Sequence, residues 1–219
     1  MASFLTDKDF RWPKKGDSPF LGGIADPNSP TWVNLDWLSQ QNIGDSLLAV
    51  AFKDAGDKII KELSRREDYR NPDVFFMPIA YLYRHSLELK MKEIIKLGIR
   101  LKLVEKDTKL LCILRKHELH PLWNFARRVI EQYWQHGSKD DLNAAGRIIQ
   151  EFHKIDRTGQ HLRYTEDQNG NKTLNQLPES VQLIHLQDVF EGVFNFLEGC
   201  EIGLNEEVRM RSEMMCEYR

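Results

Sequence analysis

The sequence has few cysteines and no long apolar stretch, and each of these scarcities excludes a class of protein. Its three cysteines, at positions 112, 200 and 216, lie far apart and form no Cys-x-x-Cys pair. A disulfide framework and a cysteine-based zinc site are therefore excluded. No apolar run is long enough to cross a bilayer, and residues 1–11 lack the basic start and apolar stretch of a secretory signal. We expect a cytoplasmic protein that has no membrane contact.

Motifs for catalysis and for cofactor binding are missing as well. The chain contains no glycine-rich phosphate loop, no serine nucleophile motif and no carboxylate pair spaced for acid–base catalysis. His117 and His120 lie three residues apart without a third ligand nearby, so we interpret them as helix-start or core histidines and not as metal ligands. The sequence predicts neither a metal nor a cofactor.

The charge that is present is unevenly distributed. The net charge is −2, but residues 84–116 carry ten basic side chains against four acidic ones, whereas residues 178–219 carry three against nine. These segments of opposite sign can attract each other within the fold or across a dimer. A basic stripe in the first segment could instead contact phosphates. The residues of that stripe are Lys90, Lys96, Arg100, Lys102, Lys106 and Lys109.

The spacing of the apolar residues predicts an all-α fold. Apolar side chains recur every three or four residues along most of the chain, as in amphipathic helices. The expected long helices span 46–65, 75–98, 117–135, 138–155 and a final segment that begins at Pro178. Asp45 is a suitable N-cap for the first of them, and the leucine-rich link 100–116 is a candidate for a short helix. We therefore expect a bundle of about five helices.

Two regions interrupt the helical pattern. Residues 1–43 contain several prolines and glycines together with Trp12, Phe20, Trp32 and Trp37, which predicts an irregular arm whose rings pack onto the helical body. Asn169-Gly170, between 161–165 and 172–174, predicts a small β-hairpin. The expected organisation is an N-terminal arm, 1–43, a helical domain, 44–203, and a C-terminal tail, 204–219.

The helix expected over 75–98 carries charged residues beside its apolar face. Arg84 and Glu88, and likewise Glu88 and Lys92, are four residues apart and can each form an ion pair of roughly 0.2–0.5 kcal/mol. One interpretation is an ion-paired edge beside the core. The other is that Arg84, His85 and Glu88 line a groove or a dimer seam, where the charges are kept despite the cost of desolvation.

Three stretches resemble, in their order, the HEPN superfamily of small helical domains. They are Arg84–Lys92, then His117–Leu119, then Asp156–Tyr164 ahead of the last helix. The resemblance covers roughly residues 44–200. It implies a helical bundle, a homodimer and a setting in prokaryotic phage defence or a toxin–antitoxin pair, with RNA or a protein as the partner.

The resemblance also bears on catalysis. Active HEPN proteins are metal-independent ribonucleases, in which an Arg and a His separated by four to six residues act on the scissile phosphate. At the corresponding place this chain has Arg157 and His161 with three residues between them, and Gly159 weakens any helix there. Arg163-Tyr164 resembles relatives that lack the nuclease pair.

The resemblance thus implies a non-catalytic binding or assembly module. The binding residues that it implies are Arg84, His85, Glu88, Asp156, Arg163 and Tyr164. The alternative is a ribonuclease that uses Arg157 and His161.

Overall fold

The structure is a computed structural model, and it describes most of the chain from residue 44 onward. The described residues are 44–65, 72–137, 139–166, 169–174 and 177–217, with the isolated residues 15, 17 and 33. Residues 42–219 form one compact unit. The expected packing of aromatic rings from the arm, 1–43, lies outside the described residues.

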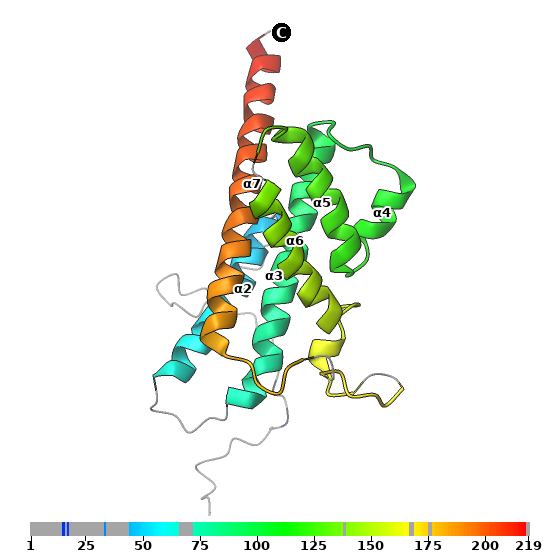
Figure 1. The fold of residues 1–219 in the computed structure, drawn as a ribbon. Coiled ribbons are helices and arrows are strands. Elements are labelled where there is room, and N and C mark those ends of the chain that lie inside the picture. Colours follow the sequence, from blue (N-terminus) through cyan, green and yellow to red (C-terminus); the bar gives the residue numbers. More distant parts are fainter. Residues whose placement is uncertain are drawn as a thin grey trace, which may run out of the picture. The chain divides into compact units, whose positions relative to one another are not determined.

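The described part of this unit is built from α-helices, so the predicted all-α fold is confirmed (Figure 1). The helices are α2 (Asp45–Ser64), α3 (Pro72–Arg100), α4 (Thr108–Leu114), α5 (Leu119–Tyr133), α6 (Lys139–Ile155) and α7 (Leu183–Glu217). A single 3-10 turn, η1 (His161–Arg163), follows α6. One N-cap differs from the prediction, because Gly44 precedes α2 and Asp45 lies in its first turn.

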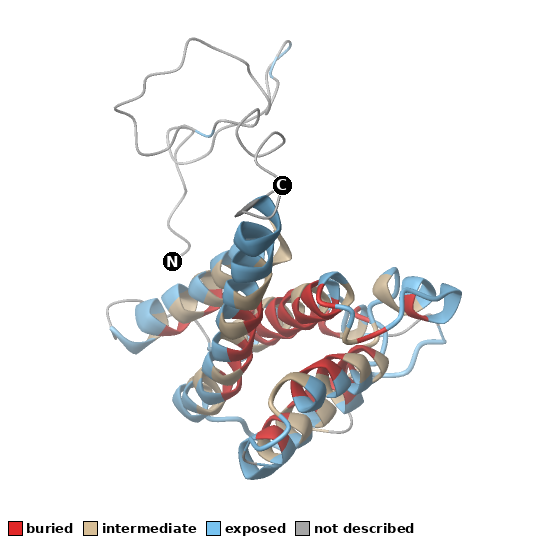
Figure 2. Cartoon of the chain, turned by 90° about the horizontal axis from the view of Figure 1, so that it is seen from above, coloured by how far each residue is buried: buried red, intermediate tan, exposed pale blue. Residues whose placement is uncertain are grey.

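Helix α3 lies at the centre of the bundle. It packs against α2, α5 and α7, while α6 packs on α5 and α7. Figure 2 shows buried residues on the inward sides of the helices and exposed residues on the outer sides. Gly98 permits the close crossing of α3 and α5, because a Cβ at this position would collide with the Val129 side chain. The core therefore depends on α3, which also carries the charged residues singled out in the sequence.

Helix α7 is longer than the sequence predicted. It begins at Leu183, not at Pro178, and it continues to Glu217 through most of the predicted tail, 204–219. Figure 1 shows its C-terminal end, in red, beyond the ends of the neighbouring helices. Pairs four residues apart support this end, since Arg211 Nε lies 2.6 Å from Glu207 Oε1. In the described residues, no helix combines the length and the apolar character that a membrane span requires.

The predicted β-hairpin does not form among the described residues. One isolated antiparallel bridge joins Glu166 to Lys172, and the Thr173 N–H donates to the Thr165 carbonyl at 3.1 Å. Gly170 has a φ of +79°, so the turn occurs where it was expected. A two-stranded ribbon without a sheet to extend it is marginally stable in water, and here the pairing stops after one bridge.

Candidate functional site

Arg84 on α3 lies at the centre of a charged cluster in which the Arg84, Glu88 and Asp156 side chains are buried and the His117 side chain is exposed. Its Nε donates to the Asp156 carbonyl at 3.0 Å and lies 3.4 Å from Asp156 Oδ2. Its Nη1 donates to Glu88 Oε2 at 3.2 Å, and its Nη2 donates to the His117 carbonyl. We call Arg84, Glu88, His117 and Asp156 the Arg84 cluster. One guanidinium thus connects α3 to the segment before α5 and to the segment after α6.

Glu88 is the anion of this cluster, and its side chain is only 1% exposed. Its Oε1 accepts from Lys92 Nζ at 2.7 Å and lies 2.8 Å from His117 Nδ1, while His85 Nδ1 lies 3.8 Å from Oε2. Burial alone would raise the pKa of this carboxyl, but the contacts with His85, Lys92 and His117 hold the pKa of Glu88 well below its usual range. Glu88 is therefore ionised near neutral pH and does not exchange protons there.

Asp156 fixes the path of the chain after α6. Its side chain is fully buried, and Oδ1 accepts from the N–H groups of Gly159, Gln160 and His161 at 2.8, 2.8 and 3.1 Å. These N–H groups would otherwise lack a partner, so the carboxylate favours the turn η1 over the extended strand that the sequence predicted for 161–165.

Gly159 is required for the same path. Its φ is +82°, a left-handed conformation that side chains disfavour. A Cβ there would also lie 3.2 Å from Arg84 Nη1 and 3.2 Å from His117 Cβ, so the segment after α6 approaches the Arg84 cluster closely only because this residue is glycine.

A row of aromatic and cationic side chains crosses α2, α3 and η1 next to the Arg84 cluster. The His85 ring lies edge-on to Phe52, with ring centres 4.5 Å apart, and stacks parallel to Tyr81 at 5.9 Å. The Arg163 guanidinium lies 5.9 Å from the Tyr81 ring centre. We call Phe52, His85, Tyr81 and Arg163 the aromatic row. The neighbouring Tyr164 is 62% exposed.

Beside Arg163 the surface is hollowed. The hollow is lined by Thr158, Gln160, His161, Arg163, Tyr164, Glu166, Asn169 and Thr173. Its walls are hydroxyl, amide, imidazole and charged groups. Such a surface can bind a polar ligand, and it continues the aromatic row toward Tyr164.

The six predicted binding residues divide into two sets. Arg84, Glu88 and Asp156 are buried and contact one another and nearby backbone groups, although Asp156 Oδ2 has no hydrogen-bond partner among the described residues. His85, Arg163 and Tyr164 reach the surface and lie on the aromatic row or beside it. Both ion pairs expected along α3 form, at 3.2 Å for Arg84–Glu88 and 2.7 Å for Glu88–Lys92.

Arg157 and His161 do not share a helix. Helix α6 ends at Ile155, Arg157 is exposed on the bend that follows, and His161 begins η1 beyond Gly159. No hydrogen bond joins the two side chains in the part of the chain that the structure describes. His161 instead lines the polar hollow together with Arg163. The ribonuclease alternative that uses Arg157 and His161 stays a prediction.

His120 and His153 form a histidine pair that the sequence did not indicate, because the two residues come from different helices. The rings of His120 on α5 and His153 on α6 lie 5.7 Å apart. His153 is 9% exposed, and its Nδ1 is buried without a hydrogen-bond partner among the described residues. Burial, followed by the nearby His120, Arg157 and Arg84, lowers the pKa of His153. His153 is therefore neutral near pH 7.

The basic stripe expected along α3 is not continuous on the surface. Lys90 is 1% exposed, and its Nζ donates to Glu201 Oε2 at 2.8 Å and lies 3.4 Å from Glu198 Oε1. Lys96 Nζ lies 2.6 Å from Asp45 Oδ2. Lys90 therefore joins the basic segment to the acidic segment of α7 within the fold, whereas Lys96 pairs with α2.

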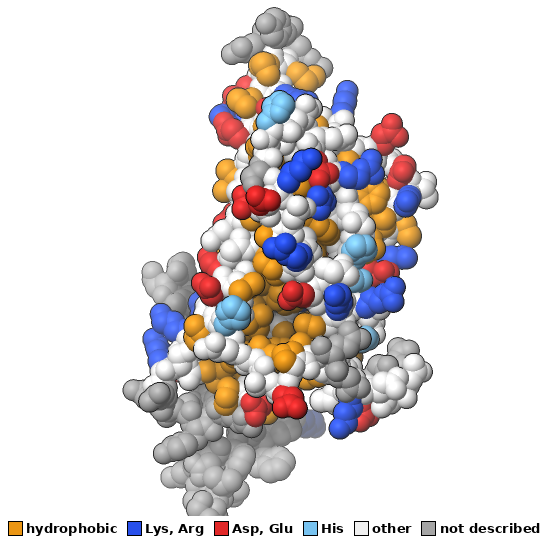
Figure 3. All heavy atoms as spheres, in the orientation of Figure 1, with side chains coloured by type: hydrophobic (Ala, Val, Ile, Leu, Met, Phe, Trp, Pro, Cys, Tyr) orange, Lys and Arg blue, Asp and Glu red, His pale blue; other side chains and the backbone are white. Residues whose placement is uncertain are grey.

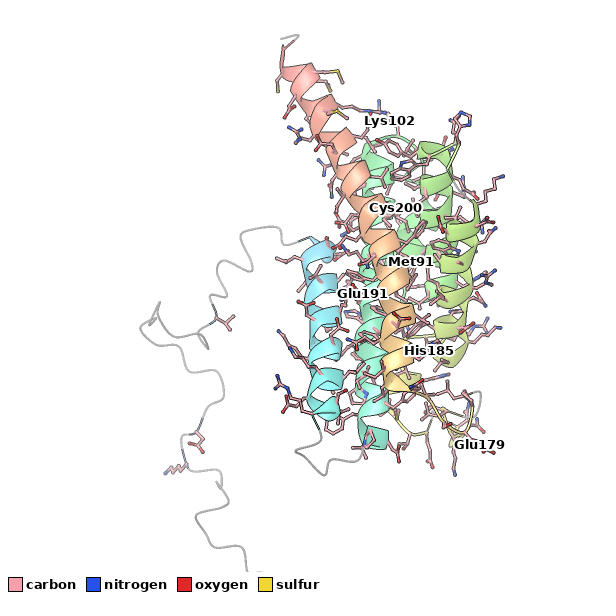
Figure 4. All side chains as sticks on the ribbon, turned by 60° about the vertical axis from the view of Figure 1, so that its left-hand side comes forward. Met91, Lys102, Glu179, His185, Glu191 and Cys200 are labelled. Carbon is pink, nitrogen blue, oxygen red and sulfur yellow. The ribbon has the colours of Figure 1, made fainter. Side chains whose placement is uncertain are left out.

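A third group of charges connects α2 to α7. Lys53 Nζ lies 2.8 Å from Asp57 Oδ2 and 2.6 Å from Glu191 Oε2. Figure 4 shows Glu191 on the side of α7 that faces α2. The Tyr83 hydroxyl donates to Asp57 Oδ1 at 2.6 Å, and burial followed by this carboxylate raises the pKa of Tyr83. These contacts are internal, so we assign them to the stability of the bundle.

Comparison with known proteins adds no relative to these observations. No family model, no curated protein and no solved structure matches the chain. Among the described residues, no group of three or more His, Cys, Asp or Glu side chains is arranged to hold a metal ion. The features that bear on function are therefore the Arg84 cluster, the aromatic row and the motif residues themselves.

Proposed function

We propose that the chain is a HEPN-like, non-catalytic module that binds single-stranded RNA on the aromatic row. The parallel stack of His85 on Tyr81, followed by Arg163, carries this proposal. Unpaired bases stack on aromatic rings and on guanidinium planes, and cationic groups attract the phosphates between them. Tyr164, exposed beside Arg163, extends the row by one more ring.

The burial of the charged residues supports binding over catalysis. The donors of Arg84 are used by Glu88 and by two backbone carbonyls, and Asp156 is used by the turn after α6. Neither group is free to contact a substrate. The low pKa of Glu88 also removes it as a proton donor near neutral pH. We assign these three residues to positioning, because they hold the segment that carries Arg163.

The biological setting that we propose follows from the resemblance to the HEPN superfamily. We propose a cytoplasmic homodimer in a prokaryotic phage-defence or toxin–antitoxin system, with a protein partner as the alternative ligand. Since Arg84 and Glu88 are buried, they would support a dimer surface from beneath, and exposed neighbours such as His85 would make the contacts.

The test is fluorescence anisotropy with a labelled single-stranded RNA in EDTA. We expect Tyr81→Leu combined with Arg163→Ala to weaken binding by about tenfold or more, since stacking and a phosphate contact are lost together. Lys58→Ala, an exposed basic residue on α2, is the matched control and should leave the affinity unchanged. An equal loss in both variants would mean nonspecific charge attraction and would overturn the assignment to the row.

The same RNA should be examined for cleavage on a gel. We expect it to remain intact with the wild-type protein. Cleavage that disappears in His161→Ala, with an unchanged circular dichroism spectrum, would instead establish the ribonuclease alternative with Arg157 and His161.

A further inference from the structure

The pair formed by His120 and His153 has a geometry that core packing does not explain. The two imidazoles come from different helices, their centres are 5.7 Å apart and their planes are tilted by 30°. Neither ring has a carboxylate as a hydrogen-bond partner among the described residues. His120 is exposed at the surface, where Asn124 Nδ2 lies 3.3 Å from its Nε2, and His153 lies behind it.

The unpartnered nitrogen of His153 is the second observation. Buried polar atoms in proteins are almost always hydrogen-bonded, and a buried atom without a partner requires an explanation. His153 Nδ1 has no partner in the described part of the chain, although the residue is nine-tenths buried. A ligand that hydrogen-bonds to this imidazole pair would supply what the fold itself does not.

The charged groups around His153 determine whether an anion or a cation would bind there. The charged or titratable groups that act on it are His120 and Glu118 at the start of α5, Arg157 after α6 and Arg84 on α3. The positive charges of Arg84 and Lys92 are already balanced by Glu88 and Asp156.

The remaining charges leave an excess of positive charge. Glu118, the one carboxylate of that group outside the Arg84 cluster, lies 4.0 Å from Lys116 Nζ. Arg157 is exposed and forms no ion pair with any described residue. Figure 3 shows histidines among basic side chains along the right-hand side of this view, over α5 and the end of α6. An anion would neutralise this excess.

We propose that His120, His153 and Arg157 form a binding site for a phosphate group. The planar guanidinium of Arg157 can donate two parallel hydrogen bonds to phosphate oxygens, and the imidazoles can donate one each when protonated. The phosphate is either a phosphodiester of bound RNA or a free phosphate ion. Only the first source depends on the proposed function, because the site itself requires no contact with the aromatic row.

Phosphate binding at this site is coupled to protonation. A bound anion favours the charged form of a nearby imidazole, so it raises the pKa of His153. Binding of a phosphodiester, whose single negative charge does not change near neutral pH, therefore strengthens as the pH falls below about 7, because a protonated His153 supplies one more donor.

The test is a titration of the full-length protein with inorganic phosphate, followed by the NMR signals of the histidine rings. We expect saturable shifts of the His120 and His153 signals and an upward change in the apparent pKa of His153. Arg157→Gln should weaken phosphate binding by about tenfold, whereas Arg147→Gln, an exposed arginine on α6, should not. Linear shifts without saturation, or equal effects of the two variants, would overturn the proposal.

A second arm distinguishes the two sources of phosphate. A diribonucleotide with a single phosphodiester replaces inorganic phosphate in the same titration. Shifts that saturate with both ligands identify an RNA backbone site, and shifts with inorganic phosphate alone identify a site for the free ion. The Tyr81→Leu/Arg163→Ala variant separates this proposal from the previous one, since it should lose RNA binding on the row and retain the response to inorganic phosphate.

Discussion

Two buried cations lie six residues apart on α3, and they serve different parts of the molecule. Lys90 contacts side chains of other helices, namely Glu201 and Glu198 on α7 and the Ser46 hydroxyl on α2 at 3.2 Å. Arg84 contacts one carboxylate of its own helix and two backbone carbonyls of connecting segments. The ammonium is a point charge that holds helices together, whereas the forked guanidinium holds loops in place. The comparison shows that burial of a charge does not by itself identify a functional site.

The largest effect should follow from Arg84→Met. This change leaves Glu88 and Asp156 buried without their shared cation, which costs about 3–5 kcal/mol of unfolding free energy. RNA binding should weaken as well, because the segment that carries Arg163 is released. Urea denaturation measures the first effect and anisotropy measures the second. A stable Arg84→Met protein with full RNA affinity would remove Arg84 from its positioning role.

A somewhat smaller effect, about 3 kcal/mol, should follow from Lys90→Met. Here Glu201 stays buried without its partner, while the half-exposed Glu198 can be solvated. The double variant Lys90→Met/Glu201→Leu should recover most of the stability, since it removes both charges. Neither change should alter RNA affinity. A loss of RNA binding in a folded Lys90→Met protein would contradict the division between the two cations.

An intermediate effect should follow from Gly159→Ala. A methyl group there must adopt a left-handed φ and displace either Arg84 or the His117 side chain, at a cost of about 1–3 kcal/mol. Gly170→Ala provides the comparison, because it shares the positive φ but has no neighbouring atom within 4 Å. The first variant should lose more stability in thermal unfolding than the second. Equal losses would mean that the close approach to Arg84 contributes nothing.

The smallest effect concerns pH. The pKa of His153 is lower in the folded chain than its ordinary value, so the unfolded chain takes up a proton first as the pH falls. The stability that the neutral imidazole provides is complete above pH 6.5 and declines below it. Glu88 titrates at far lower pH and does not contribute in this window. His153→Gln should flatten the stability profile between about pH 7 and pH 5.5 in phosphate-free buffer, measured by urea denaturation.

Local features of the fold could be predicted from the sequence, and distant contacts could not. The helices and the pairs Arg84–Glu88 and Glu88–Lys92 follow from spacings of three and four residues. The contact between Arg84 and Asp156 joins residues 72 positions apart, and no periodicity signals it. The strand predicted for 161–165 was wrong because a carboxylate five residues upstream of His161 accepts its backbone N–H and those of two neighbours.

The candidate site divides along the same line. The structure brings Arg84, Glu88 and Asp156 together in one cluster, whereas their role in binding stays a prediction. The burial of Arg84, Glu88 and Asp156 could not be predicted, because a charged stripe on a helix is equally consistent with a solvent-exposed face. The pairing of His120 with His153 was not predicted, because the two rings come from α5 and α6 and no fixed sequence spacing connects residues on different helices.

Arg84 holds the segments around His117 and Asp156 through their main-chain carbonyls, which any amino acid supplies. Substitutions at most positions of these segments therefore leave the anchoring contacts intact. Asp156 and Gly159 are exceptions. The Asp156 side-chain oxygen accepts a backbone hydrogen bond, and a Cβ at position 159 would crowd Arg84 and His117. In homologous chains, the side chains on the surface next to η1 can therefore vary while the backbone path of this segment stays the same.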